Sequence, residues 1–325
     1  MRLGRRGNLP LLAAFLLTAA LACTSLMVGV SDLSLAALAA GDDRAWLVLW
    51  ESRVPRMLAL VLSGASMAIA GLLMQIVIRN RFVEPSTVGT VEAAGMGLLV
   101  MTLLAPGAPV IVKMAVGAVF AMAGTGLFLL ILRRVPLRDQ MMVPLIGIIL
   151  TGVLQAVTTF FAYRADLMQT VLAWTQGDLS GVLRGRYELL WLGAAVAGLA
   201  WITADRFTLA GLGRDMAASL GLAHGRVVGL GLAIVSLVTA VVVVTVGIIP
   251  FLGLIVPNLV SLALGDNMRR AVPWVAVSGA GLVLGCDILG RTLRAPYEIP
   301  VGTILGVIGS LVFLILLLRR RADAA

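Results

Sequence analysis

The sequence predicts an all-α polytopic membrane protein with ten transmembrane helices, from its composition and from the lengths of its apolar segments. Of the 325 residues, 60% are hydrophobic and 13% are charged, and the mean hydropathy is +1.05. Soluble domains contain roughly 45–50% apolar and about 25% charged residues, so most of this chain is expected to lie in a bilayer. Apolar runs separated by short polar loops fill nearly the whole length. About 20 helical residues cross the hydrocarbon core, which is close to the length of most runs.

Each run is expected to form one helix, because a bilayer offers backbone N–H and C=O groups no partner outside the helix. Glycines such as Gly64 and Gly71 allow closely packed helices. No residues remain for a soluble domain, so residues 1–325 are predicted to form a single transmembrane domain. The ten runs are, in chain order, 10–30, 57–78, 92–105, 110–132, 141–162, 187–204, 227–248, 250–264, 271–289 and 300–318.

Orientation follows from the loops in which Lys and Arg gather, because cytoplasmic loops carry the excess. If the N-terminus is inside, the cytoplasmic loops and ends hold 16 of the 25 Lys and Arg residues. Both termini are therefore predicted to be cytoplasmic. The net charge of +9 reflects this topology. It does not indicate a nucleic-acid partner, because no basic stripe is interleaved with exposed aromatic residues.

The first run has an alternative interpretation as a signal peptide, since a basic start precedes an apolar centre and small residues. Against cleavage, the run stays apolar to Val30, and its removal would leave an odd number of spans. Cys23 and Cys286 fall in apolar runs without metal or redox spacing. Both are expected to be small buried hydrophobic residues, and no metal or cofactor is predicted.

Enzymatic chemistry is not expected. The single histidine, His224, belongs to no HExxH motif, and no GxSxG motif occurs. A P-loop requires GxxxxGK[ST], and the only lysine, Lys113, lies between Val112 and Met114. The remaining classes are a channel, a secondary transporter, or the membrane half of a pump that another chain supplies with ATP.

Ionisable residues are scarce in the middle of the apolar runs, whereas ion-coupled carriers place such residues in the bilayer interior. Glu92 and Asp287 lie near the ends of their runs. This favours a pathway for a large solute without ion coupling. Neutral polar residues are candidates for that pathway, although for any single one of them a capping or helix-contact role is the favoured explanation. The candidates are Gln75, Gln155, Thr158 and Thr159.

Five stretches resemble, in order, the permease subunits of FecCD-type ABC importers, which carry ferric siderophores, vitamin B12 or haem. The resemblance covers about residues 45 to 320 and implies the type II ABC importer permease architecture. NRFVEPSTVGT is similar to the catecholate siderophore branch, of which petrobactin is an example. Vitamin B12 and haem stay alternative cargos, and an ion-coupled secondary transporter is the rival class. The stretches are WESRVPRMLALVLSGASMAIAGLLMQ, RNRFVEPSTVGT, GLGRDMAASLGL, VGIIPFLGLIVPNLV with GDNMRR, and CDILGRTLRAPYEIPVG.

Two positions depart from the family pattern. Asn258 follows Pro257, where many members have a histidine, so no role of that histidine carries over. Ser310 follows Gly309, where many members have Gly-Pro. Neither departure changes the expected fold, but both leave the cargo open.

The resemblance implies several partners: a second permease subunit, two cytoplasmic ATPase subunits and an extracytoplasmic siderophore-binding protein, besides membrane lipid. Arg53, Arg56 and Arg291 resemble outward arginines that meet acidic residues of the binding protein, and a guanidinium can hold a carboxylate with two hydrogen bonds. Replacing all three by Glu is expected to weaken docking with little change in stability. Anchoring in lipid head groups is the alternative. Arg294 and Glu298 are expected to pair locally.

The loop 205–226 is predicted to contain a short helix. Gly213 serves as a permissive N-cap, Asp215 lies in the first turn and Gly221 ends the helix. A helix of two turns is marginal by itself, so it needs a surface to lie on. The resemblance implies a cleft of the ATPase, and packing on the membrane surface is the alternative. The predicted coupling residues are Leu212, Gly213, Arg214, Asp215, Met216, Leu220 and Gly221, of which Leu212, Met216 and Leu220 share one face.

Overall fold

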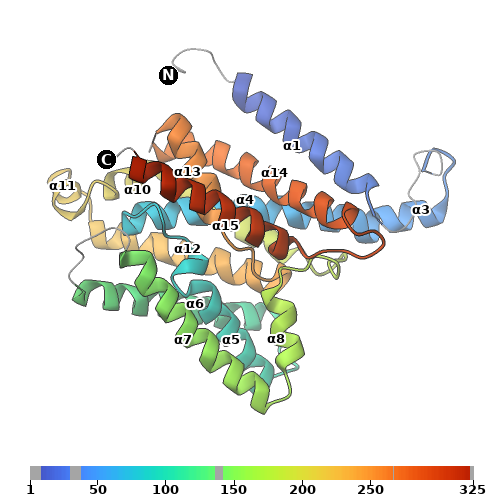
Figure 1. The fold of residues 1–325 in the computed structure, drawn as a ribbon, viewed down its shortest axis with the longest axis horizontal. Coiled ribbons are helices and arrows are strands. Elements are labelled where there is room, and N and C mark those ends of the chain that lie inside the picture. Colours follow the sequence, from blue (N-terminus) through green and yellow to red (C-terminus); the bar gives the residue numbers. More distant parts are fainter. Residues whose placement is uncertain (1–8, 30–37, 136–141, 266, 323–325) are drawn as a thin grey trace.

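The computed structural model describes residues 9–29, 38–135, 142–265 and 267–322, and every regular element within these ranges is helical. The helices form a bundle in which neighbouring long helices run roughly alongside one another (Figure 1). Six helices in the described ranges are long and apolar enough to cross a membrane. Together, α9 (Leu189–Ile202) and α10 (Ala204–Ala210) would supply a seventh, bent by 64°.

The remaining elements include helices that match the predicted runs and short helices and turns between those runs. They are α1 (Leu9–Met27), α3 (Asp43–Val48), a π-helical turn (Leu49–Arg53), α4 (Val54–Ile78), a 3-10 turn (Pro85–Thr87), α5 (Thr90–Leu104), α6 (Val110–Arg134), α7 (Met142–Arg164), α8 (Met168–Thr175), α11 (Arg214–Ser219), α12 (His224–Val246), α13 (Leu252–Leu264), α14 (Met268–Thr292) and α15 (Val301–Ala322).

Each of the ten predicted runs coincides with a helix, so the all-α fold is confirmed. Three of these helices, α5, α13 and the apolar part of α15, are shorter than a full span. Sequence periodicity missed α3, α8 and α10. Helices of one or two turns are unstable alone, so their formation depends on tertiary contacts that hydropathy does not record.

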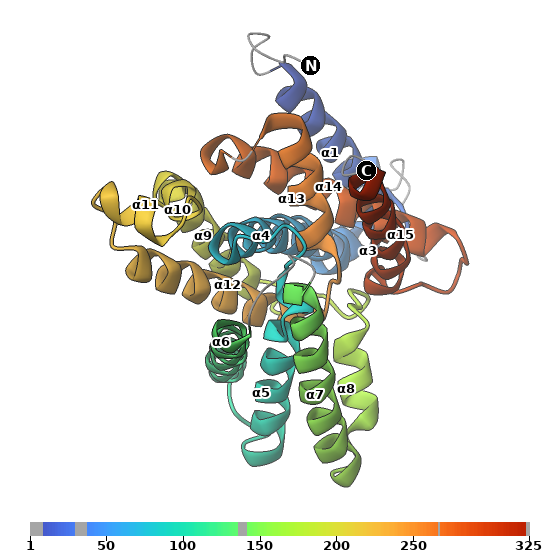
Figure 2. The ribbon, with the colours of Figure 1, turned by 60° about the vertical axis from the view of Figure 1, so that its left-hand side comes forward.

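Helix α4 lies at the centre of the bundle and contacts α9, α12, α13 and α14. Helix α12 also contacts α5 and α6, so it joins the α4 group to a second group made of α5, α6 and α7 (Figure 2). The residues of α4 from Ser66 to Gln75 are all buried. This central position explains why α4 is apolar around its whole circumference.

Two glycines of α4 allow the backbones of neighbouring helices to touch, as the sequence predicts. A methyl group on Gly71 would lie 2.2 Å from Gly253 Cα in α13. A methyl group on Gly64 would lie 2.8 Å from the carbonyl oxygen of Gly279 in α14. Any larger residue at these positions would force the helices apart, because backbone cannot move aside as a flexible side chain can.

The two cysteines lie in different surroundings. Cys286 is buried in α14, as expected, but Cys23 in α1 is exposed, so the expectation for Cys23 is wrong. The reason is the position of α1 at the edge of the bundle, where it contacts chiefly α14 (Figure 1). Hydrophobicity places a residue in the bilayer, but it does not tell which face of the helix meets protein.

Candidate functional site

Five charged residues meet where α4 begins and α14 ends: Arg53, Arg56, Asp287, Arg291 and Glu298, here called the arginine cluster. The guanidinium of Arg56 donates to Asp287 Oδ1 at 2.7 Å and to Glu298 Oε2 at 2.8 Å. Arg291 forms an ion pair with the other oxygen of Asp287, Oδ2. Asp287 therefore lies between two guanidinium groups, and its side chain is fully shielded from solvent.

The arginine cluster also holds the C-terminal end of α1. Arg291 donates to the carbonyl oxygen of Ser25 at 3.0 Å and to its hydroxyl oxygen at 2.6 Å. Arg53 and Arg291 both donate to the carbonyl oxygen of Val28. Arg53 is 7% exposed and Arg291 is 5% exposed. The predicted docking arginines thus come together, but with partners from their own chain.

Glu298 does not pair with Arg294, so that expectation is wrong. Glu298 binds Arg56, and the Arg294 guanidinium lies 6.0 Å from the centre of the Tyr297 ring. The cause is a backbone hydrogen bond of 3.0 Å from Ile299 N to Gly290 O, which folds the segment after α14 back against that helix. From the sequence, Asp287 was noted only as an ionisable residue near the end of its run and was given no partner. It lies four residues before Arg291, a spacing that pairs charges on one helix face.

The predicted short helix in the loop 205–226 is present as α11. Gly213 precedes it with φ +106°, a conformation that glycine adopts without a Cβ clash. At its end, Leu222 N donates to Ala217 O and Gly221 N donates to Ala218 O, both at 2.9 Å. These two bonds form a Schellman motif with Gly221, at φ +75°, as the left-handed residue. The predicted cap and stop are therefore confirmed.

The apolar face of α11 is open. Leu212, Met216 and Leu220 are 50%, 56% and 59% exposed. The helix protrudes at one end of the bundle, where it contacts α10 and α12 (Figure 1). Arg214 and Asp215 are exposed beside this face. A helix that leaves three large apolar side chains uncovered has a surface suited to a partner protein.

A cavity of about 540 Å³ lies behind this loop, between α10 and the ends of α4 and α13 and the start of α14. Arg79 and Leu212 are among its lining residues. Arg79 is left-handed, with φ 58°, and ends α4. A methyl group on Gly213 would lie 2.9 Å from Arg79 Nη1, so the Arg79 side chain packs against the start of α11. The end of the central helix is thus in direct contact with the short helix.

The four predicted pathway residues divide into two pairs. Gln75 is buried, and its Nε2 donates to Gly253 O at 3.1 Å. Thr158 is buried and donates to Leu154 O in its own helix at 2.9 Å. The hydrogen bonds of Gln75 and Thr158 agree with the alternative interpretation, in which such residues make helix contacts and do not line the pathway. Gln155 and Thr159 instead lie exposed on α7, in a shallow groove with Gly152, Ala156, Phe160 and Tyr163.

Glu84 and Asn258 connect the segment between α4 and α5 to helix α13, and sequence reasoning assigned neither a role. Glu84 is 1% exposed, and its Oε1 accepts a hydrogen bond of 2.8 Å from Phe251 N at the start of α13. Asn258 Nδ2 donates to Arg81 O at 2.7 Å. A carboxylate at a helix N-terminus is stabilised by the helix dipole. The signal for Glu84 was its place before Pro85, since a proline often occupies the first helical position.

Comparison with known proteins gives consistent matches. The model of the FecCD transport family matches residues 12–319. The chain is 47% identical to the petrobactin import system permease protein YclN of Bacillus subtilis (strain 168), over 95% of this chain and 98% of that protein. It is 44% identical to the petrobactin import system permease protein FatD of Bacillus anthracis, over 96% of this chain and 92% of that protein.

A third relative and one solved structure extend this comparison. The chain is 38% identical to the ferric-anguibactin transport system permease protein FatD of Vibrio anguillarum, over 92% of this chain and 95% of that protein. A solved structure of a metal-chelate type ABC transporter in an inward-facing conformation superposes with a TM-score of 0.80. It covers 95% of this chain and 98% of that chain at 23% identity, so it shows the fold alone.

Proposed function

Because this chain belongs to the FecCD transport family, we propose that it is the membrane-spanning permease subunit of an ATP-driven importer for a ferric siderophore, of catecholate type. The observation that carries the cargo class is the 47% identity to a petrobactin import permease over 95% of the chain. The protein is a multi-pass protein of the inner membrane, consistent with its apolar helices. The permease itself performs no chemistry on the cargo.

The proposed assembly contains a second permease subunit, two cytoplasmic ATPase subunits and an extracytoplasmic binding protein. In this assembly all ten apolar helices lie in the bilayer, the long ones crossing it and the shorter ones ending within it. Both termini lie in the cytoplasm. The charge distribution supports this orientation, because it places α11 on the side that is rich in Lys and Arg and the arginine cluster on the other. The superposition with the metal-chelate transporter supports the type II architecture.

The proposed mechanism is alternating access. ATP binding and hydrolysis in the ATPase move α11. The exposed Met216 of α11 inserts into the partner, together with Leu212 and Leu220, which flank the helix. Helix α11 contacts α12, and α12 contacts the central helix α4, so motion at the loop reaches the centre of the bundle. The permease then opens alternately to the binding protein and to the cytoplasm.

An uptake assay tests the proposed function. Cells lacking their own permease receive this chain with its partners, and uptake of ferric catecholate, ferric hydroxamate and cobalamin is measured. Ferric catecholate is expected to enter in an ATP-dependent way, and equal failure of all three would refute the cargo class. The Gln155→Ala, Thr159→Ala double variant tests the pathway in the same cells. An unchanged KM for uptake would show that the exposed polar residues of α7 do not line the pathway.

The docking proposal for Arg53, Arg56 and Arg291 needs a test that separates docking from stability, since all three also bind their own chain. Replacing Arg56 by Lys keeps a charge but loses the planar donor pair. We expect this variant to weaken binding-protein association, with a salt dependence that reflects screening over about 8 to 10 Å. Arg294→Lys is the control, because Arg294 is exposed and outside the arginine cluster. Docking that survives Arg56→Lys at low salt, together with an unchanged melting temperature, would refute the proposal.

An ion-coupled carrier stays a second candidate because of one residue. The Oε2 atom of Glu92 in α5 is buried and has no hydrogen-bond partner among the described residues. A carboxyl group in that position is the kind of site through which carriers couple to ions. Uptake into liposomes that contain this chain and an ion gradient, but no nucleotide, would establish this class and exclude the ATP-driven one.

A further inference from the structure

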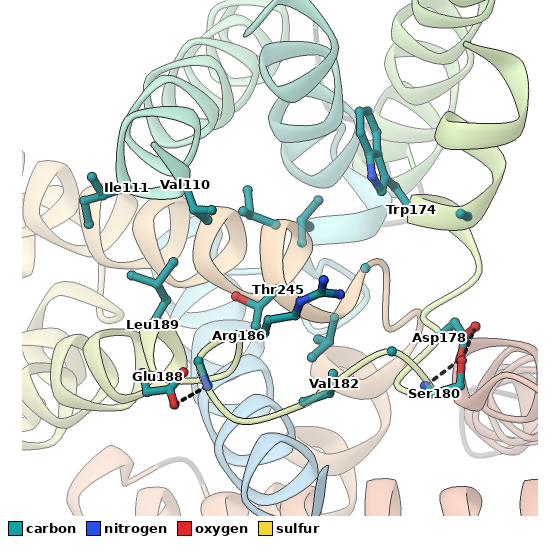
Figure 3. Close-up of a pocket in the computed structure, with 17 residues that line it drawn as sticks. Val110, Ile111, Trp174, Asp178, Ser180, Val182, Arg186, Glu188, Leu189 and Thr245 are labelled. Atoms are coloured by element: carbon teal, nitrogen blue, oxygen red, sulfur yellow. Dashed lines mark hydrogen bonds between the residues drawn. The ribbon is translucent and has the colours of Figure 1, made fainter. Parts of the chain in front are cut away.

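A cavity of about 890 Å³ opens at one end of the bundle, outside the sites described above (Figure 3). Four helices end or begin at it: α6 and α9 begin, and α8 and α12 end. The loop between α8 and α9 closes its lower side in Figure 3. Helices α6, α9 and α12 belong to the apolar helices proposed above to lie in the bilayer, and each of them begins or ends here. That membrane placement puts the cavity at the depth where the hydrocarbon core meets the head groups.

One wall of the cavity is apolar and faces out of the bundle. It is formed by Val110 and Ile111 of α6, Leu189 of α9 and Val244 of α12. Val110 is 54% exposed and Ile111 is 49% exposed. Helices α6 and α12 continue from this wall as long apolar helices, so an acyl chain that begins here can follow them into the bilayer.

The centre of the cavity is cationic. Arg186 extends across it beside Thr245 (Figure 3). Its guanidinium forms no ion pair or hydrogen bond with another residue of the described ranges. Helices α6 and α9 both begin here without a side-chain cap, so their first N–H groups add positive potential. Trp174 adds an indole N–H to the lining.

Acceptor groups lie around this cationic centre. Glu188 and Asp178 line opposite ends of the cavity (Figure 3). Glu188 accepts a hydrogen bond of 2.7 Å from Gly185 N, and Asp178 accepts from Ser180 N at 2.8 Å, which fixes both carboxylates. Thr245 donates its hydroxyl proton to Val241 O at 2.7 Å, so its oxygen is left as an acceptor. With one arginine and two carboxylates, the cavity is complementary to a ligand that carries one anionic and one cationic group.

We propose that this cavity binds the phosphoethanolamine head group of a membrane phospholipid. The phosphate is held by Arg186 and by the N-termini of α6 and α9, and the ammonium group donates to Thr245 and Glu188. One acyl chain lies along Val110 and Ile111. An anionic phosphoglycerol head group is less suitable, because it brings no cation to the two carboxylates. The inference rests on the membrane placement proposed above, but not on the cargo or on the ATPase.

Native mass spectrometry of the purified, delipidated full-length chain tests this site. Phosphatidylethanolamine, phosphatidylglycerol and phosphatidylcholine with identical acyl chains are added separately. The wild type is expected to retain one phosphatidylethanolamine in preference to the other two lipids. Arg186→Ala is expected to weaken this retention roughly tenfold, as for the loss of a hydrogen bond to a charged group. Glu188→Gln is expected to reduce the preference for phosphatidylethanolamine over phosphatidylcholine, whose ammonium carries no N–H.

Arg184→Ala is the matched control. Arg184 lies two residues earlier on the same loop, but it pairs with exposed Glu51 at 3.3 Å and does not line the cavity. Equal retention of all three lipids by the wild type, or equal loss in the Arg184 and Arg186 variants, would overturn the proposal. So would an Arg186→Ala variant that keeps its lipid but loses the binding protein, because the cavity would then receive a protein carboxylate.

Discussion

Replacing Asp287 by Ala is expected to destabilise the folded protein by about 3–5 kcal/mol, the cost of leaving buried charges without their partner. Asp287 is the carboxylate between Arg56 and Arg291, and its side chain is fully shielded from solvent. Without it, Glu298 alone would face three guanidinium groups. The end of α1 would also loosen, because Arg291 holds Ser25. The expected result is a much lower yield of folded protein in membranes and a lower melting temperature in detergent.

Glu51→Ala provides the matched control for this experiment. Glu51 also pairs with an arginine, Arg184, but its side chain is 48% exposed. An exposed ion pair contributes about 0–1 kcal/mol, so this variant should melt close to the wild type. Equal melting temperatures for Asp287→Ala and Glu51→Ala would show that the arginine cluster does not stabilise the fold. Glu298→Ala should lie between them, since that side chain is 24% exposed.

Gly221→Val is expected to abolish transport while leaving the protein inserted and folded. A methyl group on Gly221 meets nothing within 4 Å, so the substitution causes no clash with neighbours. The cost comes from φ +75°, where a β-branched residue is strained by about 1–2 kcal/mol. The Schellman motif would shift or open. A helix displaced by one residue turns by about 100°, so α11 would present the wrong side chains to the ATPase.

The measurement for Gly221→Val is cargo-stimulated ATP hydrolysis and uptake, side by side, in liposomes with all partners. Gly221→Ala should be milder, because a single methyl tolerates the left-handed region better than a branched side chain. Gly225→Val is the control: Gly225 also has open space at its Cβ position, but its φ is not in the left-handed region. Wild-type coupling in the Gly221→Val variant would show that α11 is not the coupling element.

The buried position of Arg53 and Arg291 corrects one expectation about these arginines. Reversal of all three charges was expected to leave stability nearly unchanged, as it would for exposed side chains. Arg53 and Arg291 are buried and hold α1. Replacing all three arginines by Glu would therefore break the ion pairs and hydrogen bonds of the arginine cluster. A loss of docking in that variant could not be separated from a loss of structure. The Arg56→Lys variant is the milder change, because it keeps a positive charge beside Asp287 and Glu298, and its melting temperature reports any loss of stability.

The sequence by itself determined the features that depend on local composition and on short spacings. Apolar length predicted ten helices, because a backbone in lipid must satisfy its own hydrogen bonds. Gly213, Asp215 and Gly221 predicted α11 correctly, because caps and stops act within a few residues. The order of the five family-like stretches predicted the FecCD family. Each of these signals lies within one segment of the chain, so it can be read without knowing how segments pack.

Only the tertiary structure decided which polar groups meet. Arg56 binds Asp287, which is 231 positions away, and Glu84 holds Phe251 across 167 positions. Hydropathy is the same for a helix face that meets lipid and for one that meets protein, since both are apolar. For this reason the exposure of Gln155, Thr159 and Cys23, and the burial of Arg53, could not be predicted. The pairing of distant helices, such as α4 with α14, fixes these outcomes.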